Sequence, residues 1–232
     1  MIKAALIDMD GILYDSMPSH AKAWEETFRS YQIPCTYEEF YLHEGRPGFS
    51  TINLIFQRTY QRDATQQEID EIYAMKCRLF KEYDKQKVMP GAKKLLSKLK
   101  ACNLKIVLVT GSGQHSLLDN LEKRFPGYFQ KDLIVTAYDV TQGKPHPEPY
   151  LIGLKKAGVP ASKAIAIENS PIGIASAVAA GICTIAVNTG PLEDKLLLAE
   201  KPDIMYASVA DMADDWDELK GSLIYQKVYF PF

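Results

Sequence analysis

Several features that identify other classes of protein are absent from the 232-residue sequence. No apolar run is long enough to cross a membrane, and the charges of Asp8 and Asp10 interrupt the first apolar run, which argues against a signal peptide. Lysine and arginine form no dense block, and the formal net charge is -2. This charge pattern offers no basic surface, so we expect neither nucleic acid nor a membrane as a partner.

Cysteine is scarce as well. The four cysteines are scattered, and no two of them have the CxxC spacing typical of metal and redox sites. With 47% hydrophobic and 24% charged residues, the composition is that of an ordinary soluble globular protein. These observations predict a cytoplasmic protein with reduced cysteines, and we expect it to be a monomer.

Six short apolar runs predict buried strands. Each is nearly continuous in apolar character, as in strands that are covered on both faces. Helical patterns of the length needed for a right-handed crossover lie between the later runs. We therefore predict an α/β protein with a parallel sheet, in which the alternation of strand and helix begins at about Met89. The predicted strands cover residues 4–7, 105–110, 132–137, 163–168, 183–188 and 203–208.

The segment between the first two predicted strands has helical patterns only. Two of its helices begin with a capping box, formed by Thr36 with Glu39 and by Thr65 with Glu68. A helical block inserted after the first strand predicts a cap domain on two linkers. The predicted helices cover residues 19–32, 36–43, 50–60 and 65–83, within a cap of residues 15–87 on a core of residues 1–14 and 88–232.

Polar residues follow four of the predicted strands. Each of these stretches alone also fits an ordinary turn, a solvated lysine or a helix start. However, ligands of open α/β sheets bind at the carboxyl ends of the strands, and all of these residues lie there. We therefore expect them to converge on one crevice. They are Asp8, Asp10, Thr110, Gly111, Ser112, Lys144, Glu168 and Asn169.

This combination of residues suits phosphoryl transfer. Asp8 can attack phosphorus as a nucleophile, and Asp10 can give a proton to the leaving group and later take one from water. The repulsion between these two carboxylates predicts a divalent cation, and oxygen ligands with phosphate favour Mg²⁺. Thr110, the Gly111–Ser112 amides and Lys144 can then hold the phosphate oxygens.

Four motifs resemble those of the haloacid dehalogenase superfamily, in the same order. They are "DMDGILYDS", "VTGSG", "GKPHPEPY" and "IENSPIGIASAVAAGI". The inserted block resembles the α-helical cap of the β-phosphoglucomutase-like subgroup. The resemblance implies a Rossmann-like core, with Asp8 as the nucleophile, Asp10 as the acid and base, and Thr110 and Lys144 as phosphate ligands.

The resemblance also implies a Mg²⁺ site formed by Asp8, the Asp10 carbonyl and the Glu168–Asn169 pair. Relatives usually carry Glu-Asp where this chain has Glu-Asn, so one negative charge is missing here. Either the metal binds more weakly or another carboxylate helps. Within the subgroup, "EGR", "STIN", "FQR" and "VTGSGQ" are most similar to an inorganic pyrophosphatase of Bacteroides-type bacteria.

Two cap helices carry candidate substrate ligands. Lys76 interrupts an apolar stripe that also contains Tyr73, and its head either reaches solvent or binds a ligand. The resemblance favours a ligand role, because a lysine at this place contacts the substrate in β-phosphoglucomutase. His20 begins another apolar stripe, where a structural role is the common one, yet relatives place a histidine at this junction.

The segment "HEGRPG", residues 43–48, is either a solvated loop or a specificity loop that reaches the crevice. In the second case Arg46 binds phosphate, and Glu44 binds the metal or sugar hydroxyls. Arg46 follows Gly45 directly, whereas β-phosphoglucomutase has a serine-arginine pair a few residues after its glycine. This difference predicts a shorter gap between two phosphate-binding ends.

Three functions are compatible with these residues. The leading hypothesis is a Mg²⁺-dependent phosphohydrolase that acts through an aspartyl-phosphate on a small phosphorylated molecule, with pyrophosphate as the best single substrate. The second is a β-phosphoglucomutase-type sugar phosphomutase or a sugar-phosphate phosphatase. A third, a weakly catalytic phosphate-binding module, is disfavoured by the complete set of catalytic residues. The aromatic segment of residues 223–232 packs on the core or contacts another chain.

Overall fold

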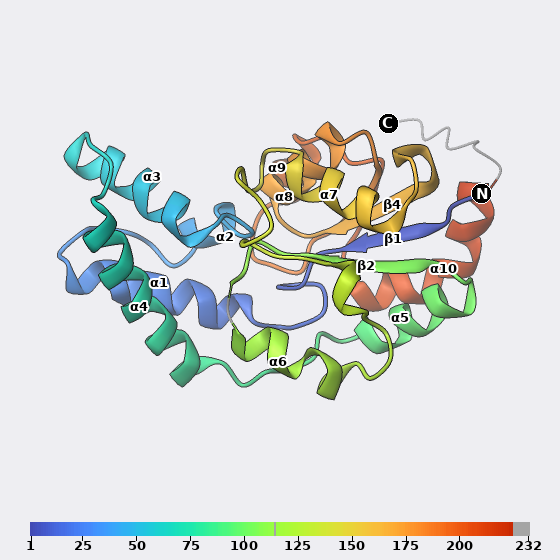
Figure 1. The fold of residues 1–232 in the computed structure, drawn as a ribbon, viewed down its shortest axis with the longest axis horizontal. Helices are drawn as coiled ribbons and strands as arrows, with labels where there is room; N and C mark the ends of the chain where they lie inside the picture. The colour runs from blue at the N-terminus through green and yellow to red at the C-terminus, as the bar shows by residue number, and fades with distance from the viewer. Residues whose placement is uncertain (114, 225–232) are drawn as a thin grey trace.

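A six-stranded parallel sheet forms the centre of the protein, as seen in a computed structural model that describes residues 1–113 and 115–224. The strand order is β3-β2-β1-β4-β5-β6, so the first strand lies inside the sheet. This arrangement confirms the predicted α/β fold with a Rossmann-like core (Figure 1). The strands are β1 (Ala4–Ile7), β2 (Lys105–Val109), β3 (Ile134–Val135), β4 (Ala164–Glu168), β5 (Cys183–Val187) and β6 (Ile204–Tyr206).

Helices cover both faces of the sheet (Figure 1). Because side chains alternate along a strand, Leu6 packs on one face and Ile7 on the other, and both are fully buried. This two-sided burial explains why the strands are continuous apolar runs. One face carries α7 (Glu148–Ala157), α8 (Pro171–Ala179) and α9 (Asp194–Leu198), and the other carries α5 (Ala92–Ala101), α6 (His115–Arg124) and α10 (Val209–Ile224).

The two edge strands are shorter than predicted. The run of residues 132–137 forms only the two-residue strand β3, which follows the 3₁₀ turn η1 (Lys131–Leu133). The chain turns away at Thr136, whose backbone N and Oγ1 both donate to Asp139, at 2.8 and 2.9 Å. Strand β6, at the other edge, is also limited to three residues. The inner strand β4, which follows the turn η2 (Ala161–Lys163), has five residues. An edge strand has one neighbour, so local side-chain hydrogen bonds compete more easily with its ladder.

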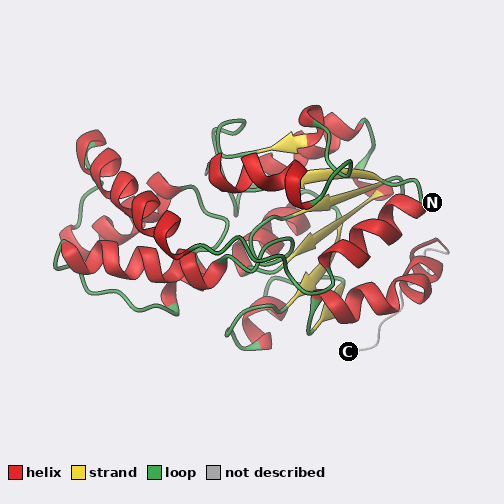
Figure 2. Cartoon of the chain, turned by 90° about the horizontal axis from the view of Figure 1, so that it is seen from below, coloured by secondary structure: helices red, strands yellow, loops and turns green. Residues whose placement is uncertain are grey.

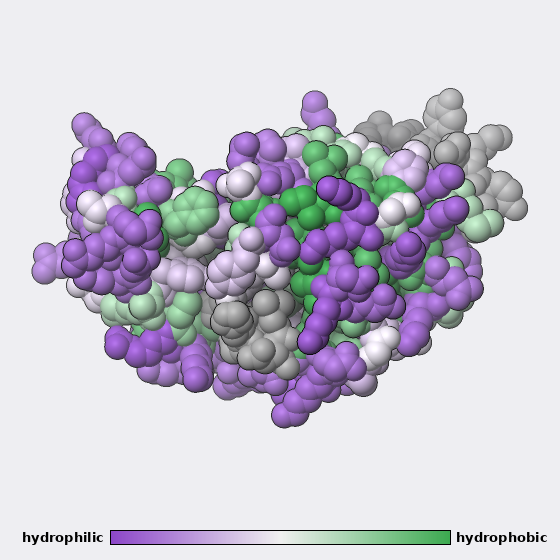
Figure 3. All heavy atoms as spheres, viewed as in Figure 1, coloured by the Kyte–Doolittle hydropathy of each residue, from purple (hydrophilic) through white to green (hydrophobic). Residues whose placement is uncertain are grey.

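Helices and loops alone form the lobe that projects from this core (Figure 2). Its own apolar core includes Trp24, Phe28 and Phe40, whose rings stack on one another. Hydrophilic side chains cover most of its viewed surface, and the outline is notched between lobe and core (Figure 3). The helices are α1 (Met17–Ser30), α2 (Glu39–Leu42), α3 (Gly48–Tyr60) and α4 (Gln66–Tyr83).

Only one of the two predicted capping boxes is complete. At the start of α4, Thr65 Oγ1 accepts from the Glu68 backbone N at 3.3 Å, and the Glu68 carboxylate accepts from the Thr65 backbone N at 2.7 Å. At the second site Thr36 Oγ1 accepts from the Glu39 backbone N, but the Glu39 carboxylate is paired with Arg58. The predicted bond from the Thr36 backbone N to the Glu39 carboxylate is therefore wrong, because this carboxylate forms an ion pair with Arg58 instead.

Two chain segments that lie side by side connect the lobe to the core. Asp15 N donates to the Lys87 carbonyl at 2.8 Å, and Met89 N donates to the Leu13 carbonyl at 2.9 Å. The domain boundaries proposed from the sequence, at 14/15 and 87/88, fall inside this pair. Among the described residues no helix is both long and apolar enough to span a membrane. Most of the aromatic C-terminal segment, residues 225–232, lies outside the described part of the chain.

Helix α7 approaches the sheet closely at Gly153. A Cβ atom at this position would lie 2.9 Å from Leu6 Cδ2 and 3.2 Å from Val109 Cγ2. We therefore expect Gly153→Ala to lower the free energy of unfolding by about 1–3 kcal/mol, the usual cost of overpacking. Gly221→Ala is the matched control, since nothing lies within 4 Å of its Cβ in α10. It should raise stability by up to ~1 kcal/mol through helix propensity. Urea unfolding of both variants measures these free energies. Equal changes in the two variants would contradict the close approach of α7 to the sheet.

Candidate active site

The carboxyl ends of the central strands bring together charged side chains that are far apart in the sequence. Lys144, in the connection before α7, places its Nζ 2.6 Å from an oxygen of Asp8 and 2.6 Å from an oxygen of Glu168. It also donates to the Val109 carbonyl at 3.0 Å. All three charged groups are buried. The crevice expected from the sequence therefore exists at this edge of the sheet.

Burial dominates the electrostatics of this cluster. Burial, together with the negative charges of Glu168 and Asp10, raises the pKa of Asp8 to about 8 against the opposing effect of Lys144. The pKa of Lys144 lies above its usual range, because its two carboxylate partners outweigh burial. Tyr150 donates to Glu168 at 2.7 Å and helps to hold this carboxylate.

Asp10 connects the core to the lobe through a second series of polar groups. Ser16 Oγ donates to Asp10 Oδ1 at 2.5 Å, and His20 Nε2 lies 3.4 Å from the same oxygen without the alignment of a hydrogen bond. His20 Nδ1 in turn lies 2.7 Å from Lys76 Nζ. Burial would raise the pKa of Asp10, but His20 and Ser16 lower it. Two polar side chains therefore lie at the same oxygen of the predicted proton donor.

Lys76 does not extend into bulk solvent. It is 3% exposed, and its ammonium lies 5.3 Å from the ring centre of Trp24 and 5.0 Å from that of Phe80. Burial lowers its pKa to about 8. Of the two alternatives left open by the sequence, the structure therefore has the lysine facing the interior of the site.

The segment of residues 43–48 lies on the core. Glu44 Oε1 accepts from Asn169 Nδ2 at 2.7 Å, and burial raises the pKa of Glu44 well above its usual range. A Cβ at Gly111 would lie 2.0 Å from the Gly45 carbonyl oxygen, so these two backbones are in contact. Such proximity requires glycine at position 111. The loop therefore reaches the crevice, as the second alternative predicted, and its role in substrate specificity stays a prediction.

A cavity of about 50 Å³ lies between the lobe and the core. Arg46 lines it with an Nε that is buried and has no hydrogen-bond partner, while its Nη1 donates to Ser50 at 3.3 Å. Gly111 and Ser112 line the core side. Thr110 is buried beside them, and its Oγ1 accepts from the Ser112 backbone N at 3.0 Å. The other predicted site residues that line the cavity are Asp10, His20, Glu44, Tyr73 and Lys76.

Comparison with known proteins identifies the family. A model of haloacid dehalogenase-like hydrolases matches residues 2–181. The chain belongs to the haloacid dehalogenase-like hydrolases. A solved structure of a candidate beta-phosphoglucomutase from Bacteroides vulgatus is 48% identical to it, with a TM-score of 0.92 over 96% of this chain and 90% of that chain.

Two relatives of this hydrolase are named as phosphatases. Phosphorylated carbohydrates phosphatase from Thermotoga maritima is 29% identical over 86% of this chain and 91% of its own length. Pyrophosphatase PpaX from Oceanobacillus iheyensis is 26% identical over 91% of this chain and 95% of its own length. The sequence-based predictions of a β-phosphoglucomutase-like member of the family and of a phosphatase-type hydrolase are confirmed.

Three residues of the hydrolase site were missed in the sequence. Ser16 and Tyr150 hold the carboxylates of Asp10 and Glu168, and His43 lines the cavity. Ser16 and Tyr150 stand at the ends of the "DMDGILYDS" and "GKPHPEPY" motifs, and this position was the only available signal. His43 is polar and adjacent to Glu44, which did not distinguish it from a solvated loop residue.

The oxygen atoms of the site that have no partner show whether it could bind Mg²⁺. Asn169 Oδ1 is buried without a hydrogen-bond partner, and Glu44 fixes the orientation of this amide through Nδ2. Within residues 1–113 and 115–224, no group of three His, Cys, Asp or Glu side chains is arranged around a metal position. A set made of the Asp8 carboxylate, the Asn169 amide oxygen and a backbone carbonyl does not need such a group. The oxygen ligands and the excess of buried negative charge fit a hard divalent cation.

The lowered pKa of Lys76 predicts an effect on stability. Folding moves this pKa from 10.5 to about 8, so below pH 8 the folded state must bury a charge. Lys76→Met should therefore raise the free energy of unfolding, on the order of 2–3 kcal/mol at pH 6.5. The gain should shrink as the pH rises from 8 towards 10.5, because the folded state has then lost the proton. Urea unfolding at pH 6.5 and 9.5 measures this gain in the free energy of unfolding. Lys85→Met, at an exposed lysine, is the control. A gain independent of pH would contradict the assignment.

Proposed function

We propose that this protein is a Mg²⁺-dependent phosphohydrolase that acts through an aspartyl-phosphate, with inorganic pyrophosphate as its leading substrate. The observation that carries the proposal is the pair of buried aspartates, Asp8 and Asp10, with different partners. Asp8 is paired with Lys144, whereas Asp10 is held by Ser16 beside His20. The two carboxyl groups therefore have environments suited to two different roles.

In the first step, the Asp8 carboxylate attacks phosphorus, and the bond from phosphorus to the leaving oxygen breaks. Asp10 gives a proton to that oxygen. Its pKa is lowered in the described site, so it takes up this proton when the negative charge of the phosphate binds beside it, because a neighbouring negative charge raises the pKa of a carboxyl group. Lys144 and Thr110 stabilise the negative charge on the transferred group. Lys144 is the stronger of the two, because its buried ammonium already compensates Asp8.

In the second step, a water molecule attacks the aspartyl-phosphate. Asp10, now a carboxylate, takes a proton from this water as it attacks, and the bond between phosphorus and Asp8 breaks. Inorganic phosphate leaves, and both aspartates return to their starting states. The loop of residues 43–48 excludes other water from the crevice, since it lies on the core at Gly111.

Asp8, the Asp10 carbonyl and Asn169 would hold the Mg²⁺. Bound there, the ion would stabilise the nucleophilic carboxylate and neutralise charge on the phosphate. Both oxygens of Glu168 already have partners, Lys144 and Tyr150 on one and the Asn169 backbone N on the other. Glu168 therefore acts mainly by holding Lys144. Glu44 contacts the Asn169 amide, and its raised pKa favours the neutral acid in the described site. A bound cation would favour its carboxylate, which would then supply the negative charge that Asn169 lacks.

The size and charge of the cavity favour pyrophosphate. The space of about 50 Å³ corresponds to only a few water positions, at roughly 10–15 Å³ each, so it suits a compact ligand better than a six-carbon sugar. Arg46, Lys76 and His20 line its far side and can bind a second phosphate. The similarity to PpaX supports the same substrate.

The second candidate is a sugar-phosphate phosphatase or a β-phosphoglucomutase-type mutase. It is favoured by the 48% identity with the Bacteroides vulgatus protein and by the name of the Thermotoga relative. Opening of the lobe would enlarge the cavity for such substrates. All of these candidates would form the aspartyl-phosphate on Asp8. A phosphatase then transfers the phosphoryl group to water, whereas a mutase transfers it to a sugar hydroxyl.

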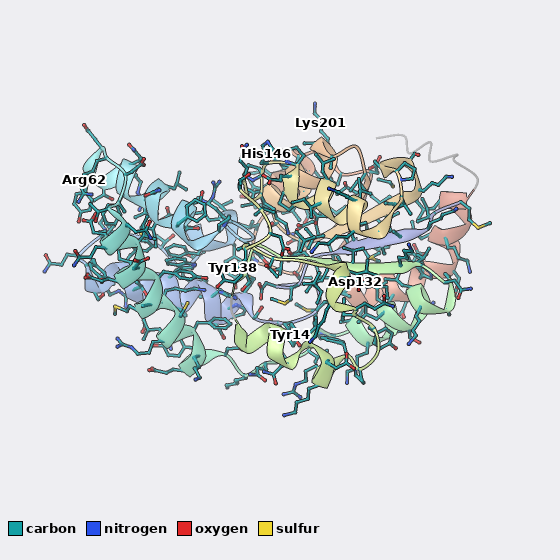
Figure 4. All side chains as sticks on the ribbon, viewed as in Figure 1. Tyr14, Arg62, Asp132, Tyr138, His146 and Lys201 are labelled. Atoms are coloured by element: carbon teal, nitrogen blue, oxygen red, sulfur yellow. The ribbon has the colours of Figure 1, made fainter. Side chains whose placement is uncertain are left out.

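The covalent mechanism predicts that Asp8→Asn abolishes turnover. The substitution keeps the volume and removes the nucleophilic charge, so kcat should fall by roughly 10³-fold or more. Phosphate release from pyrophosphate with Mg²⁺ measures it, and EDTA should abolish the parent activity. Asp132→Asn, at the opposite edge of the sheet (Figure 4), is the control and should behave as the parent. Near-parental phosphate release by Asp8→Asn would refute the mechanism.

The substrate assignment predicts selective effects in the lobe. Lys76→Ala should lower pyrophosphate turnover by roughly 10- to 100-fold, the effect of losing a charged hydrogen bond. Turnover of 4-nitrophenyl phosphate should change far less, because its leaving group carries no second phosphate. Glu71→Ala, exposed on α4, is the control. Rapid isomerisation of β-glucose 1-phosphate with little pyrophosphate hydrolysis would instead establish the mutase.

A further inference from the structure

The connection between β3 and α7 carries Lys144 and is fixed at both ends. Before Lys144, the Glu148 carboxylate accepts from the backbone N of Thr141 at 3.1 Å, from Thr141 Oγ1 at 2.9 Å and from the backbone N of Gln142 at 2.7 Å. After Lys144, the His146 carbonyl accepts from buried Ser176 Oγ at 2.6 Å. Tyr138 and His146 mark this connection on the side of the core that faces the lobe (Figure 4).

Glu148 joins this connection to a rigid element. It is the first residue of α7, where the helix dipole also favours a carboxylate. The helix itself is fixed on the sheet, because Tyr150 is fully buried and donates to Glu168. The three hydrogen bonds of Glu148 therefore extend the rigidity of α7 to Thr141 and Gln142, within three residues of Lys144.

Lys144 needs such support because its contacts are demanding. Its ammonium satisfies Asp8, Glu168 and the Val109 carbonyl at once, in a site from which water is excluded. A lysine side chain has four flexible bonds, so the position of its backbone decides whether all three contacts form. A shift of about 1 Å in a catalytic group is enough to slow a reaction 10²-fold.

The same connection also receives the lobe. A Cβ at Gly143 would lie 2.3 Å from Pro47 Cγ, so the loop of residues 43–48 rests on the residue immediately before Lys144. Gly45 touches the Lys144 side chain as well, since its Cβ would lie 3.1 Å from Lys144 Cδ. Movement of Thr141 or Gln142 would therefore disturb both the lysine and the surface on which the lobe closes.

We propose that Glu148 is a positioning residue for phosphoryl transfer, which acts through Thr141 and Gln142 to hold Lys144 and the Gly143 contact surface. Glu148 does not line the cavity. Its effect on the reaction passes through Lys144. This inference rests on the role proposed above for Lys144.

A double-mutant cycle with 4-nitrophenyl phosphate tests the inference, because this substrate does not depend on the pyrophosphate assignment. Glu148→Ala should lower kcat roughly 10- to 100-fold with little change in KM. In a Lys144→Ala background the same substitution should have almost no further effect, since two residues that act as a unit are not additive. Glu148→Gln keeps one acceptor oxygen, so its kcat should fall less than that of Glu148→Ala. Glu122→Ala, which removes a comparable bond to the Gly127 backbone N far from the site, should leave kcat unchanged.

The possible outcomes separate this inference from the proposed function. Parental kcat in Glu148→Ala, with Lys144→Ala impaired, overturns the positioning role alone. A parental kcat in Lys144→Ala overturns both the positioning role of Glu148 and the role proposed for Lys144. Equal losses from Glu148→Ala in the two backgrounds show a general structural role and also overturn the inference. If Glu148→Ala does not fold, Thr141→Val can replace it, because this substitution removes only the hydroxyl donor. The double-mutant cycle of Thr141→Val with Lys144→Ala then tests the positioning role.

Discussion

Lys144 places its ammonium 2.6 Å from a carboxylate oxygen of Asp8 and equally close to one of Glu168, in a region closed to water. Two carboxylates cannot stay charged there without compensation, because transfer of an unpaired charge into a protein interior costs several kcal/mol. The rest of the site depends on this arrangement. It holds Asp8, the proposed nucleophile, beside a positive charge, and the buried carboxyl groups around it outnumber the buried lysines, which fits a divalent cation.

The helical lobe adds a second set of charges to the same crevice. Lys76 and His20 approach Asp10 from one side, while Glu44 binds the Asn169 amide from the other. Glu44 reaches Asn169 from the loop of residues 43–48, which lies on the core at Gly111. In this closed arrangement the lobe and the core both line the cavity.

Backbone proximity makes such closure possible. Gly111 meets the Gly45 carbonyl, and Gly11, at φ +80°, approaches the Asn169 side chain so closely that a Cβ would lie 2.0 Å from Nδ2. A side chain at either position would overlap with these groups, so the close approach of the loop and of the Asn169 amide requires glycine there.

The sequence alone was sufficient for the sheet, the inserted helices and the gathering of Asp8, Thr110, Lys144 and Glu168, because buried strands carry a continuous apolar signal and parallel strands end at one edge. It could not determine the direction of Lys76, since the same helical stripe suits a solvated or an enclosed ammonium. Nor could it show that Glu39 leaves its capping box for Arg58, or that Ser16 and Tyr150 hold the carboxylates of Asp10 and Glu168. These contacts depend on the path of the folded chain, which brings their partners together, and local sequence preferences do not determine it.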